Sequence, residues 1–254
     1  LDNNIKIPKI IERLKDYSEG LIPVLDNSNR ILGVITSQNL VEVVDEEMGE
    51  DYAKFAGLTA EEDLSEPLIE SLKKRLPWLL ILLCLGMIVS SVVGIFEGVI
   101  AGLPIIMAFQ TLILDMSGNV GTQSLAVTIR VLMDENLTFG QKVQLVWKEV
   151  RIGFCNGLIL ATLSFLFLGL YIHFVKDRPW GFSYSMSGCI GVSLVVAMII
   201  SSTLGTLIPM FFKKIKVDPA VASGPLITTL NDLIAVVTYY SMSWILLFNV
   251  LHLA

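Results

Sequence analysis

Residues 222–251 read "ASGPLITTLNDLIAVVTYYSMSWILLFNVL", an apolar stretch that nevertheless contains an aspartate, Asp232. A helix of about 20 apolar residues is long enough to cross the roughly 30 Å hydrocarbon core of a bilayer. An acidic side chain within such a helix costs about 2.5–3.5 kcal/mol on insertion scales, so Asp232 needs a compensating role. The stretch therefore predicts a membrane protein with a functional carboxylate in its interior.

The composition supports a membrane protein. Hydrophobic residues make up 54% of the 254 residues and the mean hydropathy is +0.70, which is too apolar for a soluble chain. Sixteen of the 24 acidic residues lie in residues 1–72. This division predicts a small α/β cytoplasmic part followed by an all-α polytopic membrane domain. Because the chain starts at Leu1 without a signal sequence, we expect it to be part of a longer protein.

Five apolar segments are long enough to cross the membrane. They are Trp78–Phe96, Val99–Val131, Val150–Phe174, Met186–Phe212 and Val221–Leu251. The glycine-containing runs "MSGNVG" (116–121) and "SGP" (223–225) are expected to interrupt helices and free backbone carbonyls toward a cavity. Ten Lys and Arg residues fall on the side of the N-terminal part and two on the other, which predicts a cytoplasmic N-terminus and an external C-terminus.

The N-terminal part has a strand–turn–strand–helix pattern. Strands are predicted at Leu21–Leu25 and Ile31–Ile35, and Thr36 or Ser37 would cap the helix that follows; a further helix is predicted upstream, near Ile10–Lys15. From Glu42 to Glu70 the chain has eleven acidic residues and a single base, Lys54. Such a stretch is typical of a solvated helical connector, and divalent cations would relieve the repulsion between its carboxylates. The predicted divisions are residues 1–48, the acidic connector 49–75 and the membrane domain 76–254.

Two aspartates within the spans are candidate site residues. By helical spacing, Asp232 lies on one face with Thr228 and Gly224, and Asp115 with Gly118 and Asn119. Small residues on a helix face also favour close packing, but packing does not explain a carboxylate. Since no span interior supplies a Lys or Arg partner, we expect a mobile cation there. Carboxylate and carbonyl oxygens suit Mg²⁺, Ca²⁺ or Mn²⁺.

Four stretches of the sequence resemble the MgtE family of magnesium transporters. They are "VLDNSNRILGVITSQNLVEVV" (24–44), "MIVSSVVGIFE" (87–97), "DMSGNVGTQSLAVTIR" (115–130) and "VDPAVASGPLITTLNDLIAVV" (217–237). The resemblance implies a homodimer with five transmembrane helices per subunit, whose second and fifth helices line an ion pathway on the dimer axis. It also implies that residues 1–48 are part of a cytoplasmic CBS domain, and that the connecting helix bars the pore when cytosolic Mg²⁺ is high.

The resemblance assigns roles to individual residues. Asp232 would face hydrated Mg²⁺, while Thr228, Gly224 and Gly118 would lend carbonyls or small surface beside it. Gly224 stands where some members have asparagine, which leaves only a backbone contact there. Asn39 stands where many CBS domains have a ribose-binding aspartate, so ATP binding is not expected. Mg²⁺ would be both the transported and the regulatory ion, with no catalytic residues and no nucleic-acid partner.

Two other functions fit intramembrane carboxylates. A proton-coupled transporter of an organic solute could use them as a proton relay. An intramembrane aspartyl protease needs two aspartates, but Asp115 and Asp232 both lack the Gly-x-Gly-Asp context of those enzymes. Channel and carrier behaviour, and selectivity among divalent ions, stay open.

Overall fold

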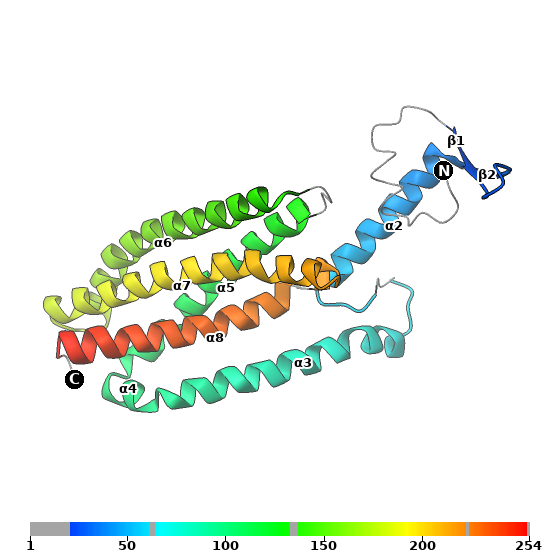
Figure 1. The fold of residues 1–254 in the computed structure, drawn as a ribbon. Coiled ribbons are helices and arrows are strands. Elements are labelled where there is room, and N and C mark those ends of the chain that lie inside the picture. Colours follow the sequence, from blue (N-terminus) through cyan, green and yellow to red (C-terminus); the bar gives the residue numbers. More distant parts are fainter. Residues whose placement is uncertain (1–20, 61–63, 133–136, 222–223, 253–254) are drawn as a thin grey trace.

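The computed structural model describes residues 21–60, 64–132, 137–221 and 224–252 (Figure 1). Its elements are β1 (Leu21–Leu25), β2 (Ile31–Thr36), α2 (Ser37–Phe55), α3 (Leu68–Ile95), α4 (Glu97–Gly102), α5 (Ile105–Leu132), α6 (Phe139–Val175), α7 (Trp180–Lys214), the 3-10 turn η1 (Pro219–Val221), α8 (Gly224–Ser243) and its π-helical continuation η2 (Trp244–Val250). Figure 1 shows the long helices lying side by side as a bundle, with α2 and the hairpin projecting from one end.

The β1–β2 hairpin and the start of α2 confirm the predicted strand–turn–strand–helix pattern. The Asp26 carboxylate accepts hydrogen bonds from the backbone N–H groups of Ser28 and Arg30, at 2.7 and 2.8 Å, which closes the turn. Thr36 caps α2, and the Asn39 side chain completes a capping box with it. Asn39 is therefore engaged in starting the helix. The predicted helix near Ile10–Lys15 lies outside the described residues.

Among the described residues, four helices are long and apolar enough to span a membrane by length and composition. They are α3, α6, α7 and the continuous α8–η2, residues Gly224–Val250. Helix α5 has 28 residues, as many as α3, but its polar side chains make it less apolar than these four. The structure therefore supports a multi-pass helical membrane protein, and the count of five transmembrane helices stays a prediction.

The predicted interruption of the second span by "MSGNVG" is wrong. Helix α5 runs unbroken through these residues, and the chain breaks earlier, between α4 and α5, at Leu103 and Pro104. Proline cannot continue a helix from the preceding turn, whereas glycine inside a helix is tolerated when neighbouring helices pack against it. The acidic connector is also divided: α2 ends at Phe55 and α3 begins at Leu68.

Glycines allow α6 and α7 to pack closely along most of their length. A Cβ on Gly157 of α6 would lie 2.9 Å from the Cα of Val195 on α7, and one on Gly153 would lie 2.9 Å from the Met198 carbonyl. Helix α5 packs against α7 and α8, whereas no residue of α3 is buried. The core of the bundle therefore lies among α5, α7 and α8, with α3 at its edge.

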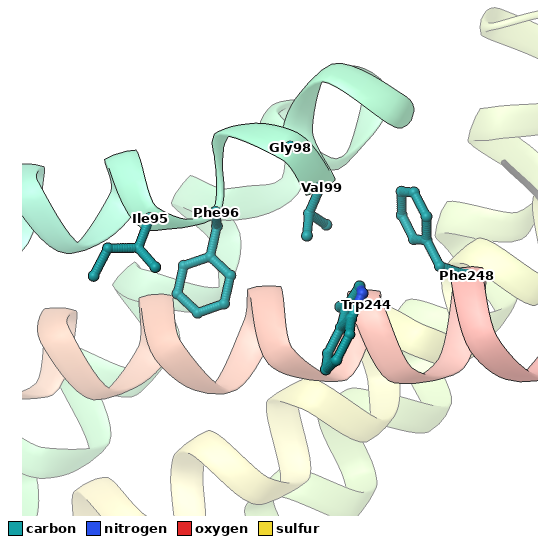
Figure 2. A pocket seen from close by; sticks show the side chains of 6 residues that line it. All are labelled: Ile95, Phe96, Gly98, Val99, Trp244 and Phe248. Carbon is teal, nitrogen blue, oxygen red and sulfur yellow. The ribbon is translucent and has the colours of Figure 1, made fainter.

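An apolar cluster fills the end of the bundle away from α2. Tyr239 is fully buried there and donates a hydrogen bond to the Ile106 carbonyl at 2.9 Å. Beside it, a cavity of about 390 Å³ lies between the α3–α4 junction and η2. Figure 2 shows Phe96 and Val99 on one side of this cavity and Trp244 on the other. The packing of aromatic rings at this end of the bundle holds α8 against its neighbours.

Replacement of Gly157 by alanine should destabilise the bundle. The new methyl group meets the α7 backbone, and such overpacking costs about 1–3 kcal/mol. Gly86→Ala on α3 is the matched control, because a Cβ there meets nothing within 4 Å and alanine favours a helix by up to about 1 kcal/mol. Thermal unfolding in detergent should show a lower midpoint for Gly157→Ala only. Equal midpoints would contradict the close α6–α7 contact.

Candidate functional site

Two glycines of α5 let α8 approach it closely. The position of a Cβ on Gly118 would be 3.2 Å from Cγ2 of Thr228, and a Cβ on Gly121 would overlap the side chain of Asn231. Both glycines are buried. Small residues are typical of membrane helices that approach at short distance. The sequence run that was expected to break the helix thus forms the contact between α5 and α8.

This contact places the two candidate aspartates near each other. Asp232 is half-buried, and its Oδ1 lies 4.0 Å from the position that a Cβ on Gly118 would take. Asp115 is exposed on the preceding turn of α5, where its Oδ1 accepts a hydrogen bond from the Asn119 side-chain amide at 3.1 Å. The two carboxylates are close enough to repel each other. Negative charge is therefore concentrated on one side of the α5–α8 contact.

Threonine hydroxyls extend the polar surface from these carboxylates toward α2. Thr122 donates to the Gly118 carbonyl at 3.0 Å, and Thr228 donates to the Gly224 carbonyl at 2.9 Å. The two hydroxyl oxygens lie 3.4 Å apart across the α5–α8 contact. We call the surface formed by Asp115, Gly118, Asn119, Thr122, Gly224, Thr228 and Asp232 the polar seam. Of the six residues predicted from sequence, Gly118, Thr228 and Asp232 lie together, Asp115 and Asn119 adjoin them on α5, and Gly224 lies at the α2 end.

The C-terminal end of α2 packs against this end of the seam. Phe55 packs against the buried pair Leu125 and Ile227, and its carbonyl oxygen lies 3.6 Å from the position of a Cβ on Gly224. Lys54 Nζ pairs with Asp218 at 3.0 Å. An aromatic ring and an ion pair therefore hold α2 against the start of α8.

Charges at this contact depend on one another. Partial burial lowers the pKa of Lys54, but its hydrogen bond to Asp218 and the negative charge of Asp218 outweigh burial and raise the pKa above its usual value. Burial, and then the negative charge of Asp218, raises the pKa of the Asp51 carboxyl. The Lys54 pair is thus fully present at neutral pH, whereas the charge of Asp51 opposes docking until that group is protonated at lower pH.

Two buried residues with a charged or amide side chain, among those described, were not predicted from the sequence. Glu149 of α6 is 3% exposed and accepts a hydrogen bond from Ser124 Oγ at 2.9 Å, while Ser202 of α7 donates to its backbone carbonyl at 2.6 Å. Glu149 lies one residue before the predicted third span, between Lys148 and Arg151. A charged stretch of this kind predicts an exposed side chain, so the sequence does not indicate that Glu149 is buried. Asn231 is fully buried beside Asp232, and its side-chain atoms have no hydrogen-bond partner among the described residues.

The seam of a single chain offers few direct metal ligands. In the part of the chain with described coordinates, no three His, Cys, Asp or Glu side chains gather at one point. Direct binding of Ca²⁺ takes about six to eight oxygen ligands, and Mg²⁺ usually keeps several of its waters. The residues present fit a hydrated cation held through its water molecules better than a dehydrated one.

Apolar helices of this length, with a carboxylate-bearing polar seam where α5 meets α8, define a multi-pass helical membrane protein. Residues 110–242 match the family model of MgtE, described as a divalent cation transporter. The chain belongs to the MgtE family. It is 35% identical over 237 residues to the magnesium transporter MgtE of Enterococcus faecalis, covering 92% of this chain and 49% of that protein.

Two further relatives give the same coverage. The magnesium transporter MgtE of Bacillus subtilis is 34% identical over 96% of this chain and 51% of its own length. That of Thermus thermophilus is 28% identical over 94% of this chain and 51% of its own length. The chain therefore spans about half the length of the relatives it matches.

Thiol accessibility should distinguish the two sides of α5. With Cys84, Cys155 and Cys189 replaced by alanine, Asn119→Cys should react with a small charged thiol reagent, because position 119 is exposed on the polar seam. Gly118→Cys should react much more slowly, since its side chain would press against Thr228.

The control for this experiment is Leu163→Cys, on the outward face of α6. Position 163 is 44% exposed but lies in an apolar helix, where a charged reagent does not enter the bilayer. If the cysteine at 119 reacts no faster than the one at 163, the exposed face of α5 does not contact water.

Proposed function

We propose that this chain is the ion-conducting part of a transporter that passes hydrated Mg²⁺ along the polar seam between α5 and α8. The position of Asp232 carries this proposal. Helix α8 contains no Lys or Arg, and the one base on α5, Arg130, is about four turns from Asp115. Carboxylates without a fixed counter-charge on their own helices are suited to a mobile cation.

The chemistry of Mg²⁺ favours passage with its water shell. The ion prefers six ligands in octahedral geometry and loses water reluctantly. The seam offers carboxylates and backbone carbonyls, which accept hydrogen bonds from metal-bound water. Holding the ion through its waters leaves it free to move on, and conduction requires binding weak enough to permit exit.

A homodimer would complete the pathway. Two-fold symmetry places the same residue of each copy opposite its counterpart, so two Asp232 carboxylates would match the charge of one divalent ion. In this arrangement α3, α5, α6, α7 and α8 are the five transmembrane helices of each subunit. The excess of Lys and Arg on one side supports a cytoplasmic position for the N-terminal part. The names of the relatives support Mg²⁺ as the transported ion.

The contact between α2 and the seam supports gating from the cytoplasmic side. Residues 1–48 would belong to a CBS domain, and divalent cations bound by the acidic connector would favour the docked position of α2. Phe55 lies beside Gly224, at the end of the seam that would open to the cytoplasm. Docking there would narrow the pathway, and movement of α2 away from it would open it.

Substitution of Asp232 tests the proposed function. Asp232→Ala should leave folding intact but abolish Mg²⁺ uptake by a magnesium-auxotrophic cell at matched membrane levels, because the charge that attracts the ion is lost. Asp232→Asn keeps the size and should weaken the preference for divalent over monovalent ions. Asp232→Glu keeps the charge and should retain partial uptake. Normal Mg²⁺ uptake by the alanine variant would overturn the proposal. So would uptake of an organic solute that is driven by a pH gradient and needs no divalent ion.

Truncation of α2 side chains tests gating. Phe55→Ala should raise Mg²⁺ flux into liposomes at high internal Mg²⁺ more than Lys54→Ala, because the half-buried Phe55 ring packs against the buried pair Leu125 and Ile227, whereas a partly exposed ion pair contributes at most about 1 kcal/mol. High ionic strength should reproduce the Lys54→Ala effect only. Tyr52→Ala, at a 77% exposed position of the same helix, is the control. A larger effect of Lys54→Ala would show that charge, not packing, holds α2.

A further inference from the structure

A second pocket lies on the side of α5 away from its contact with α8, and Asn119 of the polar seam forms part of its lining. It has a volume of about 230 Å³ and is bounded by α5, α6 and α7. Three carboxamide side chains line it: Asn119 and Gln123 from α5, and Asn156 from α6. The remaining wall is mostly aliphatic and includes Ile159. A pocket with a few converging polar groups in an apolar wall is the usual form of a binding site.

The position of Asn156 needs an explanation. It is the only residue with an amide or charged side chain between Arg151 and His173, a stretch of α6 whose other residues are apolar or small. A polar side chain at membrane depth is costly unless it faces protein or water. Because two amides of α5 line the same pocket, the three together indicate that water occupies it.

The pocket has room for a hydrated divalent cation. It is partly open and has a volume of about 230 Å³, more than the roughly 180 Å³ that six waters occupy in the liquid at about 30 Å³ each. An ion without its waters would need direct oxygen ligands on all sides. The aliphatic wall does not supply them, so the pocket suits the complete hydrated ion.

The hydrogen-bonding chemistry also matches. Water bound to a cation points its hydrogens outward and therefore needs acceptors. Asn119 uses its amide N–H to bond Asp115, which leaves its carbonyl oxygen to accept. Gln123 and Asn156 each add a carbonyl oxygen. The Asp115 carboxylate, which Asn119 contacts, adds negative charge at the edge of the pocket nearest the polar seam.

We infer that this pocket, lined by Asn119, Gln123 and Asn156, is a second binding station for a hydrated divalent cation, beside the polar seam. The inference rests on the proposed function, because the pocket would be a second binding site on the same Mg²⁺ pathway, next to Asp232. Neutral amides hold such an ion more weakly than carboxylates do. Weak sites next to a stronger one allow ions to enter and leave rapidly.

A cysteine at Ile159 reports on the pocket without measuring transport. In the background without Cys84, Cys155 and Cys189, Ile159→Cys in liposomes should react with a small charged thiol reagent. Mg²⁺ should slow this reaction, relative to a monovalent salt of equal ionic strength. Hexaamminecobalt(III) should slow it too, because its ammine N–H groups point outward like bound water and do not exchange. Leu163→Cys, one turn along α6 and outside the pocket, is the control.

Removal of one acceptor should weaken the protection. Asn156→Leu keeps a similar volume without the carbonyl, and should raise the cation concentration that gives half-maximal protection about tenfold, or about 1.4 kcal/mol. Thr162→Val, a polar-to-apolar change on α6 outside the pocket, should leave that concentration unchanged.

Each other outcome overturns the inference. No reaction at Ile159→Cys would mean that lipid or another helix fills the pocket. Reaction unaffected by both cations, or protection unchanged in Asn156→Leu, would mean that water enters but no ion binds at the amides. Mg²⁺ flux measured in the same liposomes separates the two proposals. Flux without protection removes the second station only, and protection without flux removes the proposed transport function only.

Discussion

The close approach of α5 and α8 at two glycines is the interaction on which the site depends. Any side chain at Gly121 would overlap Asn231, and one at Gly118 would press on Thr228. On its other flank, Gly121 presents its carbonyl to Gly205 of α7, where a Cβ would collide with it. Helices α5, α7 and α8 therefore come together at Gly121 and Gly205, which have no side chain to keep them apart. Their rotation about one another is fixed there, which is what turns Asp232 toward α5 rather than toward lipid.

The bundle has an apolar half and a polar half. Around Tyr239 the contacts are aromatic and aliphatic. Toward α2 the apolar pair Leu125 and Ile227 is joined by hydroxyls that link the helices, including the hydrogen-bonded Ser117 and Ser201 and the group around Glu149. In hydrocarbon a hydrophobic driving force between helices is absent, so close packing and hydrogen bonds hold the polar half together. Hydroxyls satisfy one another with small side chains, which keeps the backbones close. The polar seam can therefore exist without loss of tight packing.

Much of this fold can be predicted from the sequence because its signals are local. Hydropathy locates the long helices, and the turn and capping residues of the hairpin act within a few positions of themselves. Insertion cost identifies Asp232 from one helix alone. Glycine is ambiguous, since it either breaks a helix or allows another to approach, and only the neighbouring helix decides. The pairing of Lys54 with Asp218 spans 164 positions, and the burial of Glu149 depends on hydroxyls from two other helices. No local pattern carries that information.

The lower apolarity of α5 follows from its place in the bundle. A helix surrounded by lipid must be apolar all round, but α5 has α7 and α8 on its buried side. Its exposed side carries Asp115, Asn119 and Gln123, which lipid does not solvate. Asp115 and Asn119 bond each other, but the face stays exposed in a single chain, where water or a second copy would cover it. The residues that make α5 a poor lipid-facing helix are thus the ones expected of a helix beside an aqueous pathway, and the proposed dimer axis is where such a face belongs.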